Sequence, residues 1–299
     1  MSGYYIGADI GGTGIKAALI DEGGDIIARR STPTPVSEGA KGILHALKGM
    51  LAALMADGPE VSGIGIGTAG RVDPEEGVVL YATDNLPGWT GMRLAAEIEA
   101  GLGLPAAVLN DANAAALGEG WLGAASGLAD YAMLTLGTGV GGALVHREEP
   151  VSGKQGAAGE FGHMVLYPGG IPCSCGQRGC AEHYLSGRAL NRLAAGADGS
   201  WDSHRLLAAF AAGDPRAAAV MDVYLNDLSL TVHNIQSFFD PGAIILGGGV
   251  AESHPLWRAA WMDRLAEASP LSFNVLPASL GNEAGMIGAA RTIMMRGRK

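Results

Sequence analysis

The sequence predicts an α/β fold divided into two lobes. Short apolar runs typical of strands alternate with longer amphipathic runs typical of helices. A strand that leads into a glycine-rich turn occurs at residues 4–14 and again at residues 131–142. A supersecondary unit used twice indicates a duplicated plan. With 299 residues, 48% of them hydrophobic, the chain can bury a core in each lobe.

We place the first lobe at residues 1–120 and the second at residues 121–299, with the boundary near Gly118–Ala125. The last helix is a candidate for crossing back to the first lobe. No low-complexity tail or flexible linker is visible in the sequence.

Composition argues against several classes of function. The net charge is -10 and the pI about 5.1, whereas nucleic-acid binding requires a basic surface, so we expect no nucleic-acid partner. No apolar run approaches the roughly 18 residues that a membrane span needs, and the first residues do not resemble a secretory signal. Three closely spaced cysteines favour a metal site over a disulfide framework. We therefore expect a cytoplasmic protein.

In the first half, the apolar runs Tyr4–Ile10 and Ile15–Ile20 predict two strands on either side of a glycine turn. Apolar residues at helical spacing in Ala40–Ala56 predict an amphipathic helix, which Gly58-Pro59 ends. The other predicted elements are a strand at Val61–Ile66, a helix at Gly91–Ala100 with Thr90 as its N-cap, a strand at Pro105–Leu109 and a helix at Ala112–Gly120.

In the second half, Tyr131–Leu136 predicts a strand, and Ala143–Val145 predicts the strand that returns beside it. The sequence predicts a long helix at Ala217–Phe239, which ends at Asp240-Pro241. The other predicted elements are a strand at Ala243–Leu246 and helices at Pro255–Ala268 and Ala284–Met295.

The first glycine turn, Asp9-x-Gly11-Gly12-Thr13, has the composition of a phosphate-binding turn. Glycine lets the backbone amides approach an anion closely. An aspartate at the end of the strand can hold Mg²⁺ through water beside those phosphates. The alternative is a simple hairpin turn with an exposed aspartate.

The second turn, Gly137-x-Gly139-x-x-Gly142, matches the dinucleotide-binding pattern, which requires a helix after the glycines. Because a strand is predicted there instead, we reject that interpretation and expect a phosphate-binding hairpin. No P-loop pattern occurs. Gly247-Gly248-Gly249 follows a strand, where it can either accept an adenine ring or allow a close crossing of a helix and a strand.

Residues 160–182 have the composition of a zinc site. His163, Cys173, Cys175 and Cys180 supply one imidazole and three thiols, which complete a tetrahedral zinc site of the structural kind. The carboxylates of Glu160 and Glu182 flank this loop and are candidates for binding a ligand, although solvated carboxylates are the ordinary alternative.

Asp111 follows a predicted strand and precedes a predicted helix. It is a candidate general base for a hydroxyl that attacks a phosphate. The alternative is that Asp111 is only the N-cap of the helix.

The three glycine motifs occur in the order found in the actin-like and hexokinase-like ATP-binding superfamily. With Glu160-x-Gly-His163 and Cys173-x-Cys-Gly-x-x-Gly-Cys180-x-Glu182, the chain resembles the ROK family of bacterial sugar kinases and repressors over about Tyr4–Ala290. The resemblance implies a two-lobed actin-like fold (ribonuclease H-like, hexokinase-type) with a structural zinc loop. It also implies ATP-dependent phosphorylation of a hexose at the 6-hydroxyl, with Mg²⁺ and structural Zn²⁺ as cofactors and a homodimer or homotetramer as the assembly.

The resemblance assigns roles to matching positions. Asp111 looks like the general base, and His163, Cys173, Cys175 and Cys180 look like the zinc ligands. The residues that resemble sugar ligands are Gly70, Asn85, Asn110, Asp111, Glu160, His163 and Glu182. Those that resemble nucleotide ligands are Asp9, Gly11, Gly12, Thr13, Lys16, Gly137, Thr138, Gly139, Gly141, Gly248 and Gly249.

The identity of the sugar stays open at this point. Glucose is favoured by Glu160-x-Gly-His163 and by the segment Asp84–Trp89, whereas Thr68-Ala-Gly-Arg71 is more similar to N-acetylmannosamine kinases. The family's glucokinases often carry lysine directly after Gly-Gly-Thr, where this chain has Gly14 and places Lys16 two residues later. N-acetylglucosamine is a further alternative.

Two functions of other kinds compete with a kinase. The family also contains sugar-sensing repressors, but only three residues precede Tyr4 and the charge is acidic, which disfavours DNA binding. A catalytically inactive relative is disfavoured because Asp9, Asp111 and both glycine turns are intact.

Overall fold

The computed structural model describes residues 3–297. The chain forms two compact units, and we describe each by itself. The first contains the described residues up to Ala129, together with Leu144–Ala158 and the residues from Ser279 onward. The second contains Asp130–Ala143 and Gly159–Ala278. The chain thus first leaves the first unit a few residues beyond the predicted boundary, and residues 144–158, predicted in the second lobe, lie in the first unit.

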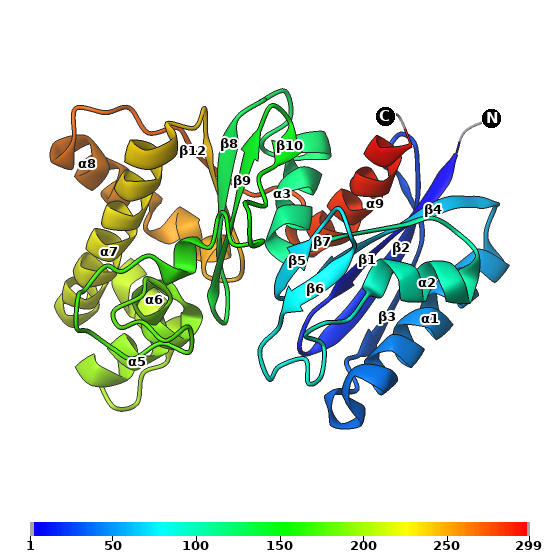
Figure 1. Cartoon of the computed structure of the whole chain (residues 1–299). Coiled ribbons are helices and arrows are strands. Elements are labelled where there is room, and N and C mark those ends of the chain that lie inside the picture. The colour runs from blue at the N-terminus through cyan, green and yellow to red at the C-terminus, as the bar shows by residue number, and fades with distance from the viewer. Residues whose placement is uncertain (1–2, 298–299) are drawn as a thin grey trace. The chain divides into compact units, whose positions relative to one another are not determined.

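The first unit contains the following elements: β1 (Tyr4–Ile10), β2 (Gly14–Asp21), β3 (Ile26–Pro33), η1 (Val36–Glu38), α1 (Gly39–Asp57), β4 (Val61–Thr68), β5 (Arg71–Asp73), β6 (Val78–Tyr81), α2 (Leu94–Leu102), β7 (Ala106–Asn110), α3 (Asp111–Leu122), β10 (Glu149–Pro150), η4 (Gly281–Glu283) and α9 (Ala284–Arg296). Its main sheet has the order β3-β2-β1-β4-β7 (Figure 1). β1 pairs with β2 antiparallel and with β4 parallel, and β4 pairs with β7 parallel.

The second unit contains β8 (Tyr131–Leu136), η2 (Phe161–His163), α4 (Glu182–Leu185), α5 (Gly187–Ala197), α6 (Ser203–Ala211), α7 (Pro215–Phe239), β11 (Ile244–Gly247), η3 (Ala251–Leu256), α8 (Arg258–Ala268) and β12 (Val275–Pro277), and β9 (Val140–His146) begins in it. The sheet order β10-β9-β8-β11-β12 repeats the order of the first sheet. β11 runs parallel to both β8 and β12. The repeated order agrees with the duplicated plan that the two glycine turns suggested.

The two faces of the first sheet carry different kinds of residue. On β1, Ile6, Ala8 and Ile10 alternate with smaller or polar residues and pack in one core with α1 and α2. On β4, Ile64 and Ile66 point into that same core. Because side chains alternate across a strand, the residues between them face the opposite side. The bulky face of the sheet is therefore the face covered by α1 and α2.

The opposite face is covered by α9, and glycine makes this packing possible. A Cβ added to Gly7 would lie 1.8 Å from the Met286 carbonyl oxygen, and one added to Gly65 would lie 1.7 Å from that of Ala289. The backbone of α9 thus rests directly on the sheet. α3 packs beside α9 with equal closeness, because a Cβ on Gly288 would lie 1.7 Å from the Ala114 carbonyl oxygen (Figure 1).

Most predicted elements are present, with ends shifted by one to three residues. Thr90 is not the N-cap of α2, which begins at Leu94; its hydroxyl accepts from the Ala82 N–H instead. The helix predicted at Pro255–Ala268 is divided, because η3 runs through Pro255 and α8 starts only at Arg258. The elements that were not predicted are β3, β5, β6, β10, β12, α4, α5 and α6.

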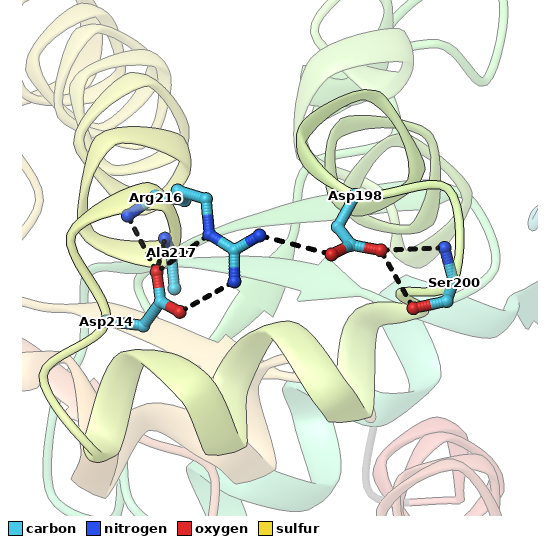
Figure 2. Close-up of polar contacts among 5 residues, drawn as sticks. All are labelled: Asp198, Ser200, Asp214, Arg216 and Ala217. Atoms are coloured by element: carbon cyan, nitrogen blue, oxygen red, sulfur yellow. Dashed lines mark hydrogen bonds and ion pairs between the residues drawn. The ribbon is translucent and has the colours of Figure 1, made fainter.

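The long helix α7 starts two residues earlier than predicted. Asp214 caps it by accepting from the backbone N–H groups of Arg216 and Ala217, and Pro215 occupies its first turn, where a proline loses no hydrogen bond. The Arg216 guanidinium bridges Asp214 and Asp198, the latter at the end of α5 (Figure 2). These ion pairs are exposed and contribute little energy, but they join the end of α5 to the start of α7.

None of the described helices is both long and apolar enough to cross a membrane.

The contact between α3 and α9 gives a direct test of the packing. We expect Gly288→Ala to lower the free energy of unfolding of the first unit by about 3 kcal/mol or more, since the new methyl would overlap the Ala114 carbonyl and force the two helices apart. The free energy is measured by urea denaturation.

Gly49→Ala is the matched control. Gly49 is an exposed residue of α1, and a Cβ there meets nothing within 4 Å. The same substitution should stabilise the protein by up to about 1 kcal/mol, because alanine is the better helix former. Equal effects of the two substitutions would contradict the close packing of α9.

Candidate active site

The predicted site residues of the first unit gather where three parallel strands end. Asp9 is near the end of β1, Gly70 follows β4, and Asn110 is the last residue of β7. Asp111 comes next and opens α3. The carboxyl ends of parallel strands share one edge of a sheet, where α/β proteins commonly bind ligands.

Asn110 holds this edge together. Its Oδ1 accepts from the N–H groups of Ala112 and Asn113, which makes Asn110 the N-cap of α3. Its Nδ2 donates to the Gly70 carbonyl oxygen and to Asp111 Oδ1, both at 2.9 Å. These four bonds use the full capacity of the amide. Asn110 therefore orients Asp111, and it can reach a sugar hydroxyl only by giving up one of these bonds.

Asp111 is the first residue of α3, so the alternative that Asp111 is the N-cap is wrong. Its Oδ1 also accepts from the Ala112 N–H at 2.9 Å. Burial raises the pKa of Asp111, an effect that the hydrogen bonds from Ala112 and Asn110 oppose. A carboxylate with a fixed orientation and a raised pKa is suited to accept a proton.

Asp9 lies close enough to Asp111 for their charges to interact. Burial, and then repulsion by Asp111, raise the pKa of Asp9 to about 6, while Lys16 acts in the opposite direction. The Asp9 carboxylate also packs against Gly285 in the first turn of α9, where a Cβ would come within 3.0 Å of it. Two carboxylates placed together in this way favour a divalent cation between ligand and protein.

The first glycine turn is a tight hairpin, as predicted. The Gly11 N–H donates to the Gly14 carbonyl oxygen at 3.0 Å, and the Thr34 hydroxyl donates to the Gly11 carbonyl oxygen at 2.6 Å. Thr13 is exposed at its tip. Lys16 Nζ lies 3.4 Å from Asn282 Oδ1, just before α9.

The loop that carries Asn85 is anchored beside this turn. Asn85 is exposed, and a Cβ on Gly12 would lie 3.1 Å from the Asn85 Cβ. Trp89 fixes the loop, because its indole N–H donates to the buried hydroxyl of Thr68 at 3.0 Å. Gly70 adopts a φ of 108°, and a Cβ there would lie 2.3 Å from the Tyr81 carbonyl oxygen, so only glycine fits.

In the second unit, the glycine turn at residues 137–142 leads into β9, which confirms that it does not form a dinucleotide-binding helix turn. The Gly137 N–H donates to the Gly139 carbonyl oxygen at 2.9 Å, and Thr138 is exposed. Glu182 lies against this turn: its Oε2 accepts from the Val140 N–H at 3.2 Å and would be 2.4 Å from a Cβ on Gly139. Glu182 is therefore not a freely solvated carboxylate.

The segment that carries Glu160 and His163 is packed on the same turn. It forms the short helix η2, in which the His163 N–H donates to the Glu160 carbonyl oxygen. A Cβ on Gly162 would lie 2.0 Å from the Val140 carbonyl oxygen, and one on Gly142 would lie 2.4 Å from that of Gly159. The glycines of both motifs are thus required for packing, a role that the sequence pattern did not reveal.

The four predicted zinc ligands form a cluster. The ligand atoms of His163, Cys173, Cys175 and Cys180 all lie within 4.8 Å of one another. Cys173 Sγ is 3.6 Å from His163 Nδ1, and Cys175 Sγ is 3.6 Å from Cys180 Sγ. Ligands around a tetrahedral zinc ion are separated by about 3.5–3.8 Å, so both the donor set and the spacing fit zinc.

The cysteine loop is also tied to the rest of the second unit, which sequence reasoning missed. The Tyr167 hydroxyl donates to the buried carboxylate of Asp227 in α7, and this bond is the main reason that the pKa of Tyr167 rises to about 12. The Ile171 N–H donates to the hydroxyl of Tyr184, whose ring packs against Tyr167. The signal in the sequence that could have indicated the contact between Tyr167 and Asp227 is the position of Asp227, an acidic residue, in the middle of the predicted helix.

At the third glycine motif, Gly248 has a φ of 88°, and a Cβ there would lie 2.5 Å from the Leu136 carbonyl oxygen. The backbone at Gly248 therefore lies directly against the end of β8, and no helix takes part in this contact, unlike in the predicted crossing of a helix and a strand. Gly249 is different, because a Cβ there would meet nothing within 4 Å. Open space beside Gly249 is compatible with the second role, an approach by a flat ring.

The chain is similar to known proteins over nearly its whole length. Residues 5–295 match the model of the ROK family. The chain is 36% identical to a glucokinase of Streptomyces coelicolor, with 96% of each chain covered. It is 33% identical to an N-acetyl-D-glucosamine kinase of Escherichia fergusonii, with 96% of this chain and 98% of the relative covered.

Two solved structures resemble this one closely. A ROK hexokinase from Thermus thermophilus has a TM-score of 0.86 at 35% identity, with 99% of both chains covered. A ROK family glucokinase from Streptomyces griseus, solved in complex with glucose and AMPPNP, has a TM-score of 0.81 at 36% identity, with 97% of this chain and 98% of that chain covered.

The raised pKa of Asp9 predicts a pH-dependent stability. A raised pKa means that the folded state favours protonated Asp9. The contribution of protonated Asp9 to the free energy of unfolding is therefore fully present below the unfolded pKa of 3.8 and is lost as the pH rises through about 6. Asp9→Asn removes the charge. In a metal-free buffer, we expect the melting temperature of this variant, relative to that of the wild type, to increase between pH 5 and pH 7.5.

The expected gain is about 1–2 kcal/mol after solvent screening, or roughly 2–6 °C. Thermal unfolding followed by circular dichroism measures it. A difference between the two melting temperatures that does not change with pH would contradict the burial of Asp9 beside Asp111.

Proposed function

Because the chain belongs to the ROK family, we propose that it is an ATP-dependent kinase that phosphorylates a hexose at its 6-hydroxyl, with glucose favoured. The observation that carries the proposal is the pair formed by Asp111 and Asp9, which Asn110 and α9 hold at the carboxyl ends of the parallel strands β1, β4 and β7. The similarity to glucokinases over nearly the whole chain supports the same reaction.

Asp111 is the general base of this reaction. Phosphoryl transfer depends mainly on positioning and on charge stabilisation, and a nearby carboxylate that accepts the hydroxyl proton contributes roughly 10²–10⁴ in rate. Asn110 and the Ala112 N–H hold one carboxylate oxygen, which leaves the other to face the sugar hydroxyl. The raised pKa strengthens Asp111 as a base.

The two glycine hairpins bind the phosphates. The residues proposed for phosphate binding are Asp9, Gly11, Gly12, Thr13 and Lys16 at the first hairpin, and Gly137, Thr138, Gly139 and Gly141 at the second. Asp9 would hold Mg²⁺, which would neutralise charge on the phosphates. Gly248 and Gly249 bind the adenosine, Gly249 through its open backbone.

The residues proposed to bind the sugar are those that the family resemblance gives: Gly70, Asn85, Asn110, Asp111, Glu160, His163 and Glu182. The Glu182 carboxylate, fixed by the Val140 N–H, connects the sugar-binding loop to the phosphate hairpin. His163 serves two purposes, with Nδ1 directed at the cysteines and Nε2 at the sugar.

N-acetylglucosamine is the second candidate substrate, because a kinase for that sugar is 33% identical over nearly the whole chain. N-acetylmannosamine is a third, supported by the 28% identity to a putative N-acetylmannosamine kinase from Listeria monocytogenes, with 99% of this chain and 100% of that chain covered and a TM-score of 0.87. One fold can host different functions, so the fold alone does not select among these acceptors.

A structural zinc ion is held by His163, Cys173, Cys175 and Cys180. It makes the sugar-binding loop of this actin-like kinase fold rigid. Three thiolates and one imidazole leave no open position on zinc, so the ion has no part in the chemical step. Its contribution is to hold Glu160 and Glu182, which flank the loop, in fixed positions.

The protein is a cytoplasmic homodimer in this proposal. On α7, Val223, Leu230 and Phe238 lie on one face and are 49%, 44% and 76% exposed. Large apolar side chains exposed in a row commonly mark an interface, here with a second copy of the chain. Sedimentation velocity measures the assembly directly, and a monomer at micromolar concentration would contradict it.

A coupled assay for ADP release tests the proposed function. With ATP and Mg²⁺, we expect glucose to give the highest kcat/KM in a panel with N-acetylglucosamine, N-acetylmannosamine, mannose and fructose. Asp111→Asn should lower kcat by roughly 10²–10⁴ while glucose still binds in calorimetry. ADP release that no sugar stimulates would refute the kinase assignment, and near-normal turnover of Asp111→Asn would refute the role of Asp111.

The metal content tests the zinc site. We expect about one zinc ion per chain by elemental analysis. Cys175→Ala should lose the metal and speed hydrogen exchange in residues 164–181, since folding of such loops depends on the ion. Ser174→Ala, at an exposed position between two ligands, should keep the zinc ion and the hydrogen-exchange rates of the wild type. Metal-free wild-type protein with full activity would rule out the structural role.

A further inference from the structure

Glu119 is a completely buried carboxylate in the last turns of α3. This is an unfavourable place for a negative charge, because the C-terminal end of a helix is itself negative and burial removes water. Such a side chain persists only where donors surround it. The family resemblance gave Glu119 no role.

Glu119 has these donors. Its Oε2 accepts from the Ala124 N–H at 2.8 Å and from the Ser279 hydroxyl at 3.2 Å. Its Oε1 accepts from the N–H groups of Ser279 and Leu280 at 3.0 and 2.9 Å. The carboxylate therefore joins the C-terminal end of α3 to a segment 160 residues away in the sequence.

Segment 279–280, which Glu119 binds, leads directly to the surroundings of the Asp9 carboxylate. Residues 279–280 are followed by η4 and then α9. Asn282 contacts Lys16, and Gly285 packs on the Asp9 carboxylate. Glu119 therefore belongs to a chain of contacts that runs from α3, which starts with Asp111, to the surroundings of Asp9, all within the first unit.

The helices on this path cannot adjust independently. A Cβ on Gly118 would lie 2.3 Å from the Ala284 carbonyl oxygen, next to Glu119, so the backbones of α3 and α9 touch there. A small shift of segment 279–280 would slide α9 along α3. Such a shift would change the distance between Asp9, which rests on α9, and Asp111, which opens α3.

We propose that Glu119 is a positioning residue that sets Asp111 relative to Asp9 by clamping residues 279–280 to α3. This inference rests on the proposed kinase function. Displacement of a catalytic group by about 1 Å can cost on the order of 10²-fold in rate. Sugar affinity should change less than kcat, because Gly70, Asn85, Glu160, His163 and Glu182 are not part of α3, α9 or segment 279–280.

Glu119→Gln tests the proposal. Glutamine has nearly the same shape but only one acceptor oxygen, so its NH₂ group would face backbone N–H donors. We expect kcat to fall by about 10–100-fold while the KM for the sugar changes by less than about 3-fold. Glu119→Asp keeps two acceptor oxygens on a shorter side chain and should recover part of the lost kcat.

Glu99→Gln is the matched control. Glu99 lies in α2 of the same unit, and its Oε1 also accepts a backbone N–H, that of Ala106, at 3.0 Å. The same chemical change at this exposed position should leave kcat within about 2-fold of the wild type, since the Glu99 carboxylate bonds Ala106 in β7 and not segment 279–280. All rates are divided by the folded fraction determined by circular dichroism.

The outcomes are separable. A lower melting temperature of Glu119→Gln with unchanged kcat, or a rise in KM alone, would show a purely structural role and overturn the proposal. Where Glu119→Gln does not fold, Glu119→Asp decides: a kcat reduced at least 3-fold at constant KM supports the clamp, and an unchanged kcat overturns it. Wild-type protein without sugar-dependent ADP release would instead refute the proposed function.

Discussion

The direct contact between the backbone of α9 and the first sheet is the constraint on which the candidate site depends. Gly7 and Gly65 leave no side chain between the sheet and the helix, so the helix axis lies closer than any larger residue would permit. α3 meets α9 with the same closeness through Gly288 and Gly118. The sheet, α3 and α9 are thus packed backbone against backbone beside Asp9 and Asp111.

This packing explains how two carboxylates stay close together. Burial raises the pKa of both carboxyl groups, and repulsion by Asp111 raises that of Asp9 further, so holding the two charged groups here costs free energy. Hydrogen bonds from Asn110 and Ala112 offset part of the cost at Asp111, and Lys16 offsets part at Asp9. The second unit uses a comparable device, since Gly142 and Gly162 bring the segment of Glu160 and His163 against the 137–142 turn. In both units a close approach of backbone, made possible by glycine, positions acidic side chains.

Local sequence patterns predicted elements well where one face alone is buried or where a turn has a strong signal. The helix at residues 40–56 and the strands at residues 4–10 and 131–136 are examples. Prediction failed where a tertiary contact overrode local preference. Thr90 has a side chain suited to an N-cap, yet it bonds Ala82 in a neighbouring loop. In β3, buried and exposed side chains do not alternate regularly, because three consecutive residues are exposed. Its sequence therefore lacked the pattern of a strand.

The sequence by itself determined the two-sheet α/β plan, the residue types at the strand ends and the set of four zinc-type ligands, because these follow from periodicity, turn chemistry and short spacing along the chain. Only the tertiary structure decided what each of these residues touches. It made Asn110, rather than Asp111, the cap of α3, and it brought Glu119 to Ser279 and Tyr167 to Asp227. Such pairs lie far apart in the sequence, and no local preference specifies them. They form because burying a polar group is tolerable only where folding supplies its partner.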